Sequence, residues 1–264
     1  MTITLDQLPN AAREAWARLR DESHRILRND LAALWAYGGT IFPDRPRRTG
    51  DLDTFAVLEH VPDERTTRTL EDMEADIERE YGIEWDIWYV LSADVRRREP
   101  PPHAFDADRR ETSWAISRAQ WLAGCYVNLH GRPPEELVLA PTWPEIEAAL
   151  SRELEHLERH VVEGDDDPFE AMYAIWNGSR ILYALETRNV AISKRSGGMW
   201  ALEHLPERWH DAIHAADRCY DGVGTRRDEE VLRLAMAPFV ALVRERLPLA
   251  EPRPVGEPPR WGGS

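Results

Sequence analysis

The order of apolar and polar positions along the first hundred residues predicts helices alternating with short strands. Apolar residues recur at helical spacing over 9–28 and again over 66–82, which indicates two amphipathic helices. The shorter apolar runs at 31–39, 51–61 and 83–95 are typical of strands. The resulting order of helix, strand, strand, helix and strand predicts an α/β unit.

A charged, Pro-rich stretch at 96–110 interrupts this alternation and is typical of a domain boundary. Beyond it we find no strand-like alternation of useful length, and helical periodicity dominates. The helical segments expected there are 112–128, 144–162, 168–186, 196–204, 206–220 and 227–246. We therefore predict an α/β domain over 1–105, a helical domain over 106–250 and a loose Pro/Gly-rich tail over 251–264.

Composition narrows the partners that such a chain can take. Its 264 residues include 48 acidic and 33 basic side chains, for a formal charge of -15. A field of this sign disfavours nucleic acid and anionic membranes and favours cationic partners. No apolar stretch approaches the ~20 residues of a membrane span, and the N-terminus lacks the pattern of a secretory signal. We therefore expect a cytoplasmic protein that acts as a monomer on small molecules.

Two aspartates stand at the head of the second expected strand. Side chains at i and i+2 of a strand point to one face, so Asp51 and Asp53 project together. At an effective dielectric of ~20, two charges ~4 Å apart repel by about 4 kcal/mol. A divalent metal such as Mg²⁺ would offset this repulsion, and Asp86 on the third strand can reach the same zone if the strands are neighbours. Taken alone, the pair is more simply a capped and solvated strand start.

A glycine turn precedes these aspartates and favours the metal site over a solvated strand start. Gly38, Gly39 and Thr40 follow the first expected strand, and backbone N–H groups in such a turn can cradle phosphate oxygens. A phosphate-binding turn, an Asp-x-Asp pair and a third acid together suit nucleotidyl transfer. In that chemistry a metal clamps the triphosphate and an acid deprotonates the attacking hydroxyl.

These motifs resemble the DNA polymerase β-like nucleotidyltransferases, in which a glycine turn is followed about a dozen residues later by Asp-x-Asp. Residues 176–209 resemble the helical C-terminal domain of the aminoglycoside (3'')(9) adenylyltransferases, in the run Arg180–Tyr183, in Lys194 and in the segment 200–206. The resemblance covers roughly 30–245. It implies an α+β fold: a polymerase β-like mixed sheet with helices, followed by an all-α helical bundle.

The resemblance also implies an activity. That family transfers AMP from Mg-ATP to a hydroxyl of streptomycin or spectinomycin, which gives antibiotic resistance. Asp51 and Asp53, with Asp86, would hold Mg²⁺, and Asp86 would also be the base that activates the hydroxyl. Arg180 and Lys194, together with the turn from Gly38 to Thr40, would bind ATP. The chain departs from the family in having Asp86 where a glutamate is usual, and Gly39 or Thr40 where a serine is usual.

The acceptor would contact a further group of residues. By position, the resemblance places Trp114, Asp166 and Glu170 against the aminoglycoside. Helical offsets place Glu170, Tyr173, Asn177 and Arg180 on one stripe, which we interpret as a face lining the cleft. The candidate substrate-binding set is therefore Trp114, Asp166, Glu170, Tyr173 and Asn177.

Simpler interpretations stay open for several of these residues. The polar stripe also fits a solvated helix face, Lys194 a surface lysine, and Trp114 a core residue in a chain with eleven tryptophans. His156 and His160 fit a surface pair better than a zinc site, because no third ligand is arranged nearby. Two other functions also remain possible: nucleotidyl transfer to a different small molecule or to a protein hydroxyl, and ligand binding without catalysis.

Overall fold

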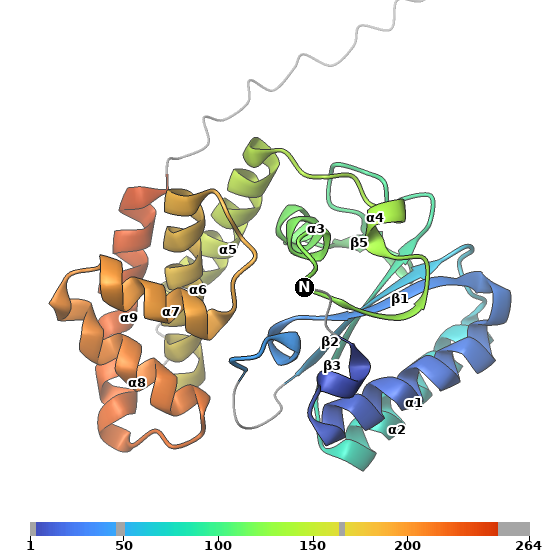
Figure 1. The fold of residues 1–264 in the computed structure, drawn as a ribbon, viewed down its shortest axis with the longest axis horizontal. Helices are drawn as coiled ribbons and strands as arrows, with labels where there is room; N and C mark the ends of the chain where they lie inside the picture. The colour runs from blue at the N-terminus through green and yellow to red at the C-terminus, as the bar shows by residue number, and fades with distance from the viewer. Residues whose placement is uncertain (1–3, 46–50, 164–166, 248–264) are drawn as a thin grey trace, which may run out of the picture.

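Strands and helices alternate in the N-terminal half of the chain as the apolar pattern predicts. The computed structural model describes residues 4–45, 51–163 and 167–247. A sheet with its covering helices lies beside a bundle of helices from the C-terminal half (Figure 1). This arrangement confirms the predicted α+β fold of a mixed sheet followed by a helical domain.

The sheet has four strands in the order β3-β2-β1-β6. These strands are β1 (Leu31–Tyr37), β2 (Leu52–Leu58), β3 (Trp85–Leu91) and β6 (Val127–Gly131). β1 pairs antiparallel with both β2 and β6, whereas β2 and β3 run parallel. The parallel pair matters for the site because both strands begin at the same edge of the sheet and carry their aspartates there.

Helices cover both faces of this sheet. On one face lie α1 (Asn10–Leu27) and α2 (Glu64–Tyr81), with Trp16 and Leu70 fully buried. The indole N–H groups of Trp16 and Trp85 both donate to the Thr54 hydroxyl, at 3.0 and 3.2 Å. Thr54 is fully buried, so these bonds fix β2 immediately after Asp53.

One expectation about the middle of the chain is wrong. We expected helix over 112–128 and no useful strand beyond 110, but α3 spans Trp114–Leu122 and is followed by β6. Val127 and Leu129 of β6 are buried while Asn128 is exposed, so the alternation is present but only five residues long. A small hairpin of β4 (Pro102–His103) and β5 (Asp106–Arg110) occupies the stretch expected to be a linker.

The C-terminal half is helical, as predicted. After the short α4 (Pro134–Leu137), it contains α5 (Trp143–Glu163), α6 (Pro168–Thr187), α7 (Lys194–His204), α8 (His210–Tyr220) and α9 (Arg226–Arg246). α6 is central and packs against α7, α8 and α9. A Cβ atom on Gly198 of α7 would lie 1.7 Å from the Trp176 ring of α6, so glycine permits this close approach. Within the described residues, none of the helices combines the length and apolarity of a membrane span.

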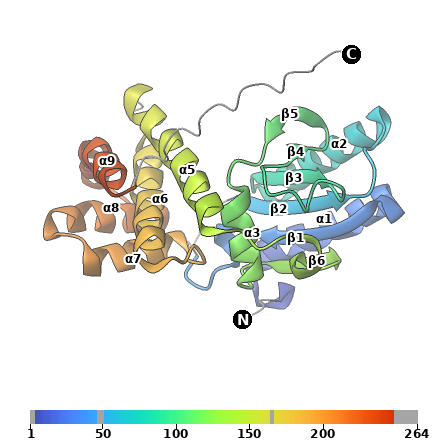
Figure 2. The same cartoon turned by 90° about the horizontal axis from the view of Figure 1, so that it is seen from above.

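α3 joins the two halves. Its Trp114 and Trp121 pack with Phe55 on the second face of the sheet, whereas Ala115 and Ile116 belong to the core of the helical half. Figure 2 shows α3 between the sheet and α5. Because β6 lies in the sheet, we propose that the first domain extends to about residue 142 rather than 105.

Glu74 of α2 gives this domain a predicted pH dependence. Its carboxylate accepts a hydrogen bond from the Tyr89 hydroxyl at 2.5 Å, and burial raises its pKa to about 7. Between pH about 4.5 and 7 the native state therefore holds a proton that the unfolded chain has released, and stability falls as pH rises. We expect Glu74→Gln to remove roughly 2 kcal/mol of this pH dependence. Urea unfolding across that pH range measures it.

The control for this prediction is Asp72→Asn, the same kind of change at an exposed position of α2. This variant should keep the wild-type dependence of the unfolding free energy on pH. Equal slopes for wild type and Glu74→Gln would contradict the assignment of this proton to Glu74.

Candidate active site

Three carboxylates meet at the edge of the sheet where β2 and β3 begin. Asp53 of β2 and Asp86 of β3 are direct partners in the parallel register, and Asp51 precedes β2 by one residue. All three line a cavity of about 320 Å³. The sequence prediction that Asp86 reaches the zone of Asp51 and Asp53 therefore agrees with the observed register.

Burial and the nearby carboxylates disfavour the charged forms of Asp53 and Asp86. Burial and the neighbouring Asp51 raise the pKa of Asp53 to about 8, although Lys194 opposes the shift. Burial and Asp51 also raise the pKa of Asp86, against the effect of Arg109. A cation bound beside these carboxyl groups would favour their charged form and would lower their pKa values.

The glycine turn is fixed against the Asp-x-Asp segment. Gly38 has φ +81°, and a Cβ atom there would lie 1.6 Å from Oδ2 of Asp53, so only glycine fits. Gly38 and Gly39 line the cavity. Thr40 does not line it, because its buried side chain donates a hydrogen bond to the Asp51 carbonyl at 3.2 Å. Thr40 thus holds the backbone at the first aspartate.

The helical half supplies the cations. Arg180 on α6 and Lys194, the first residue of α7, line the same cavity as the three aspartates. The Lys194 ammonium lies 5.0 Å from the centre of the Tyr173 ring. Burial lowers the pKa of Lys194, and the Asp51 carboxylate counteracts this shift. Residues from both halves of the chain therefore form one site of mixed charge.

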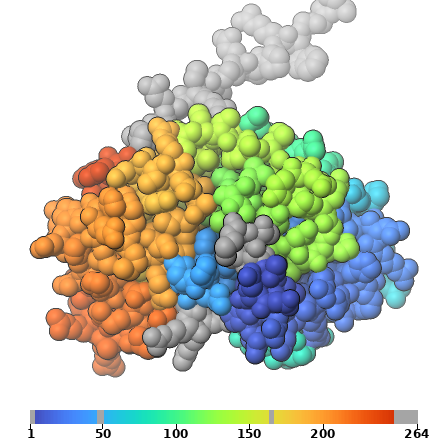
Figure 3. Space-filling model, viewed as in Figure 1, coloured from blue at the N-terminus to red at the C-terminus, as the bar shows by residue number. Residues whose placement is uncertain are grey.

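Hydrogen bonds hold the two halves together beside this cavity. The hydroxyls of Ser193 and Ser196 donate to one oxygen of Asp44, at 2.5 and 2.6 Å. Arg195 donates to the carbonyl oxygens of Asp44 and Arg45, at 3.1 and 3.3 Å. Figure 3 shows this light-blue segment of the first half against the orange helices of the second. These bonds place Lys194 within reach of the aspartates.

Three predicted acceptor residues lie along the wall of the cavity or beside it. Tyr173 and Asn177 line the cavity, as the helical stripe predicts. Glu170 lies beside it, in an opening of about 430 Å³ shared with Asp51 and Asp86, and its carboxylate is 3.7 Å from His160. Asp166 lies outside the described residues.

Trp114 is not where the sequence interpretation placed it. Its side chain is 1% exposed, its ring stacks on Phe55 at 5.7 Å, and its indole donates to the Arg97 carbonyl at 2.9 Å. A ring covered on both faces offers no surface for a ligand to stack on. The alternative interpretation, a core tryptophan, describes Trp114 as the structure has it.

Sequence reasoning missed two carboxylates and a tyrosine. Glu111 and Glu153 line the cavity, and the Tyr220 hydroxyl would lie 3.4 Å from a Cβ atom on Gly39. Glu111 directly follows the charged stretch interpreted as a linker, and Glu153 is one of many acids on α5. Neither position carries a spacing that separates it from an ordinary surface acid.

The structure thus has two parts, a mixed sheet that carries the three aspartates and a helical domain that carries Arg180 and Lys194. Residues 144–245 match the family model described as aminoglycoside adenylyltransferase, C-terminal domain. This match relates the helical part of the chain, 102 of its 264 residues, to that family.

A solved structure supports the fold over nearly the whole chain. The structure of spectinomycin adenyltransferase AAD(9) from Enterococcus faecialis, with ATP and spectinomycin, matches with a TM-score of 0.70 at 16% identity. The match covers 88% of this chain and 98% of that chain. Comparison with curated proteins finds no match.

Proposed function

We propose that this protein transfers AMP from ATP to a hydroxyl of an aminoglycoside of the streptomycin or spectinomycin type. The observation that carries the proposal is the meeting of Asp51, Asp53 and Asp86 with Arg180 and Lys194 in one cavity. Nucleotidyl transfer needs cations for the triphosphate and carboxylates for a metal and for the attacking hydroxyl. The family match to the helical domain and the fold of the spectinomycin adenyltransferase agree with this chemistry.

Mg²⁺ fits this site as a partner of bound ATP rather than as a resident ion. Among the described residues, no group of three or more His, Cys, Asp or Glu side chains could hold a metal alone. Mg²⁺ is commonly held by one or two carboxylates together with substrate phosphates, and the pKa of Asp53, raised by burial and by Asp51, supports a cation beside these carboxylates. Asp51 and Asp53, with Asp86 beside them, would hold the ion, which would neutralise phosphate charge when bound.

The protein's own groups would then perform the following steps. The turn at Gly38 and Gly39, with Arg180 and Lys194, holds the triphosphate. Asp86 accepts the proton of the acceptor hydroxyl, whose oxygen attacks the α-phosphorus in line. A new O–P bond forms to AMP, the bond to the β-phosphate breaks, and pyrophosphate leaves. Tyr173, Asn177 and Glu170 contact the acceptor at the edge of this zone.

The proposed reaction would confer resistance on a cell that contains the protein. Modification of an aminoglycoside hydroxyl would give antibiotic resistance. The reaction would take place in the cytoplasm, where ATP is available, and would need one copy of the chain, because the cavity is lined by both halves of a single chain. The net charge of -15 favours a cationic acceptor over nucleic acid.

Mass spectrometry tests this function directly. Purified protein is incubated with ATP, Mg²⁺ and either streptomycin or spectinomycin, and the expected product is the drug carrying one added AMP. Absence of this product with both drugs, from protein that binds ATP, would contradict the proposal. Radiolabelled ATP with a panel of other hydroxyl compounds would then identify a different acceptor.

A further inference from the structure

The segment between α6 and α7 belongs to the helical half in sequence, but residues of the first half hold it in place. It consists of residues 188–193, is here named the α6–α7 segment, and leads directly into Lys194. Val190, Ile192 and Ser193 of this segment line the cavity together with Lys194. The position of Lys194 opposite the aspartates therefore depends on where the α6–α7 segment is fixed.

Gln120 of α3 holds the middle of the α6–α7 segment. Gln120 is 9% exposed, and its Nε2 donates a hydrogen bond to the Val190 carbonyl at 2.9 Å. The same carbonyl accepts the backbone N–H of Ile192 at 2.9 Å, and Val190 is buried. Trp121, the next residue of α3, packs on the sheet. Because buried carbonyl groups require hydrogen-bond partners, Gln120 fixes this segment to the helix that covers the sheet.

Asp44 holds the end of the segment and the first turn of α7. One oxygen of its carboxylate accepts hydrogen bonds from the hydroxyls of Ser193 and Ser196, at 2.5 and 2.6 Å. The Ser193 hydroxyl in turn accepts the backbone N–H of Ser196 at 2.9 Å, which caps the helix. Lys194 lies between these two serines. Since Asp44 closely follows the glycine turn at Gly39–Ile41, it connects that turn to Lys194.

Arg195 ties the same turn of α7 to a third element. Its guanidinium donates to the backbone carbonyls of Asp44 and Arg45 and also binds two carboxylates at the end of α8. The carboxylates belong to Asp217 and Asp221, at 2.7 and 2.6 Å. A planar guanidinium offers several donors in a fixed arrangement, so Arg195 orients the start of α7 relative to both halves.

The second cation of the site rests on the same helix. Gly197 of α7 lies against Arg180, since a Cβ atom on this glycine would lie 2.9 Å from Cγ of Arg180. The guanidinium of Arg180 donates to Oδ1 of Asn177 at 3.2 Å. A shift of α7 would therefore displace Arg180 as well as Lys194, and both line the cavity.

We propose that Asp44 and Gln120 are positioning residues for AMP transfer, which hold the α6–α7 segment so that Lys194 meets the phosphates of ATP. Asp44 acts through Lys194, because it is absent from the described residues that line the cavity. This role rests on the proposed function for the part that Lys194 plays. It assigns a task in the reaction to two residues of the first half that carry no motif in the sequence.

A double-mutant cycle on nucleotide binding tests whether Asp44 acts through Lys194. Calorimetry with Mg²⁺ and the non-hydrolysable analogue α,β-methylene-ATP gives the affinity of wild type, Asp44→Ala, Lys194→Met and the double variant. Each single variant should bind about tenfold more weakly, because a charge-assisted contact with phosphate is misplaced or lost. In the Lys194→Met background, Asp44→Ala should change the affinity by less than about twofold. Losses that simply add in the double variant would overturn the proposal.

Two further variants separate these hydrogen bonds from general damage to the fold. Asp44→Asn keeps an oxygen that can accept from both serine hydroxyls, so it should recover most of the affinity lost in Asp44→Ala. Ser196→Ala removes one bond at an exposed residue and should weaken binding by about threefold. It keeps the proposal testable if Asp44→Ala does not fold. Wild-type affinity in Ser196→Ala, or no recovery in Asp44→Asn, would contradict the role of these bonds.

Gln120 needs a cycle of its own, because it lines the cavity itself. Gln120→Leu removes the donor to the Val190 carbonyl and keeps a side chain of similar size. It should weaken binding of the ATP analogue in the wild-type background and should have no further effect in Lys194→Met. A loss that persists in Lys194→Met would mean that Gln120 contacts the nucleotide directly, against its assignment as a positioning residue.

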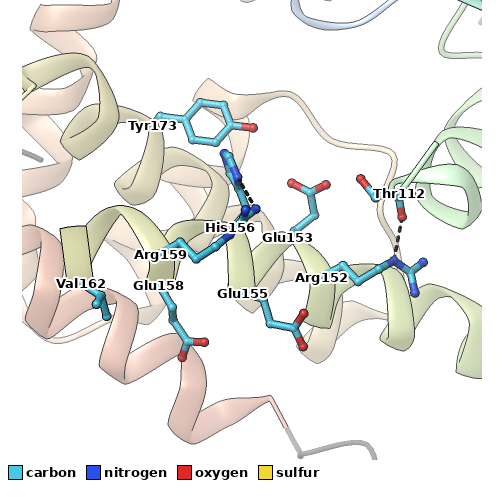
Figure 4. Close-up of a pocket in the computed structure, with 9 residues that line it drawn as sticks. All are labelled: Thr112, Arg152, Glu153, Glu155, His156, Glu158, Arg159, Val162 and Tyr173. Carbon is cyan, nitrogen blue, oxygen red and sulfur yellow. Dashed lines mark hydrogen bonds between the residues drawn. The ribbon is translucent and has the colours of Figure 1, made fainter. Parts of the chain in front are cut away.

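Figure 4 identifies a matched control in the helical half. Glu158 of α5 accepts two hydrogen bonds from Arg244 of α9, at 2.7 and 2.5 Å, so one carboxylate again links two elements. Its side chain points away from the side of α5 where the Tyr173 hydroxyl lies. Glu158→Ala should lower the thermal midpoint but keep wild-type affinity for the ATP analogue. A loss of affinity in this control as large as that in Asp44→Ala would overturn the specific role of Asp44.

The outcomes also distinguish the positioning role from the proposed function. If Asp44 and Lys194 are coupled in the cycle but neither drug gives an AMP adduct, the positioning role stands and the proposed acceptor is wrong. If the adduct forms and the losses in the cycle add, the proposed function stands and the positioning role fails.

Discussion

Asp53→Asn is expected to reduce AMP transfer by about a thousandfold while making the ligand-free protein more stable. The loss follows from the proposed role of Asp53 in holding Mg²⁺, since several kcal/mol of charge stabilisation corresponds to a factor of this size. The gain follows from the raised pKa of Asp53, about 8, which burial and the Asp51 carboxylate cause. Asparagine has the same shape without the charge, so it fits beside Gly38 and removes the repulsion.

Thermal unfolding in the presence of a chelator measures the stability, and AMP transfer with excess Mg²⁺ measures the activity. The matched control is Glu59→Gln at the opposite end of β2, where the carboxylate accepts a hydrogen bond from Ser92 at 2.6 Å. This control should keep full activity and should not gain stability. If Asp53→Asn lowers the thermal stability instead, the Asp53 carboxylate is paired in the ligand-free protein. If this variant keeps full activity, Asp53 takes no part in AMP transfer.

The sequence predicted the site best where the candidate residues follow the repeat of one strand or one helix. The alternation of a strand placed Asp51 and Asp53 on one face, and the parallel pairing of β2 with β3 brought Asp86 to Asp53. Helical spacing likewise predicted that Tyr173 and Asn177 face the same way as Arg180, and all three line the cavity. Which side chains share a face follows from residues close in sequence, whereas the position of Asp86 also required the pairing of β2 with β3.

The wrong and missed predictions concern residues whose roles depend on packing between distant segments of the chain. A tryptophan that stacks on a ligand and one buried against Phe55 have the same local sequence, and only the packing of α3 on the sheet decides between them. β6 was missed because its five residues join the sheet through pairing with β1, which lies some ninety residues earlier. Glu111 and Glu153 become functional candidates only when the hairpin and α5 meet at Ser113.

The same long-range packing explains why the site needs both halves of the chain. The aspartates lie on the sheet, and the cations lie on α6 and α7, which no local pattern connects to the strands. Asp44 bridges them by accepting hydrogen bonds from Ser193 and Ser196, which places the first residue of α7, Lys194, opposite Asp51. The charge balance of the cavity is therefore a property of the assembled fold rather than of either half.

Asp86→Asn is expected to lower the rate of AMP transfer by roughly 10²- to 10⁴-fold, the usual contribution of a general base, while ATP binding is retained. Asparagine cannot take the proton of the acceptor hydroxyl, but it preserves the size of the side chain at the start of β3. Asp86→Glu should recover part of the rate lost in Asp86→Asn, because it restores a carboxylate at this position. Single-turnover kinetics with spectinomycin and calorimetry with ATP measure the two quantities separately.

The comparison variant is Asp94→Asn, the same chemical change just beyond the other end of β3, where Asp94 pairs with Arg97 at 2.9 Å. It should turn over at the wild-type rate, because the rate depends on the carboxylate at the edge shared with Asp53. A fully active Asp86→Asn protein would exclude Asp86 as the base. If that variant instead lost ATP affinity together with turnover, Asp86 would act mainly by holding the metal with Asp51 and Asp53, and another group in the cavity would have to accept the proton. One such candidate is Glu111, which lines the cavity and whose pKa burial raises to about 7.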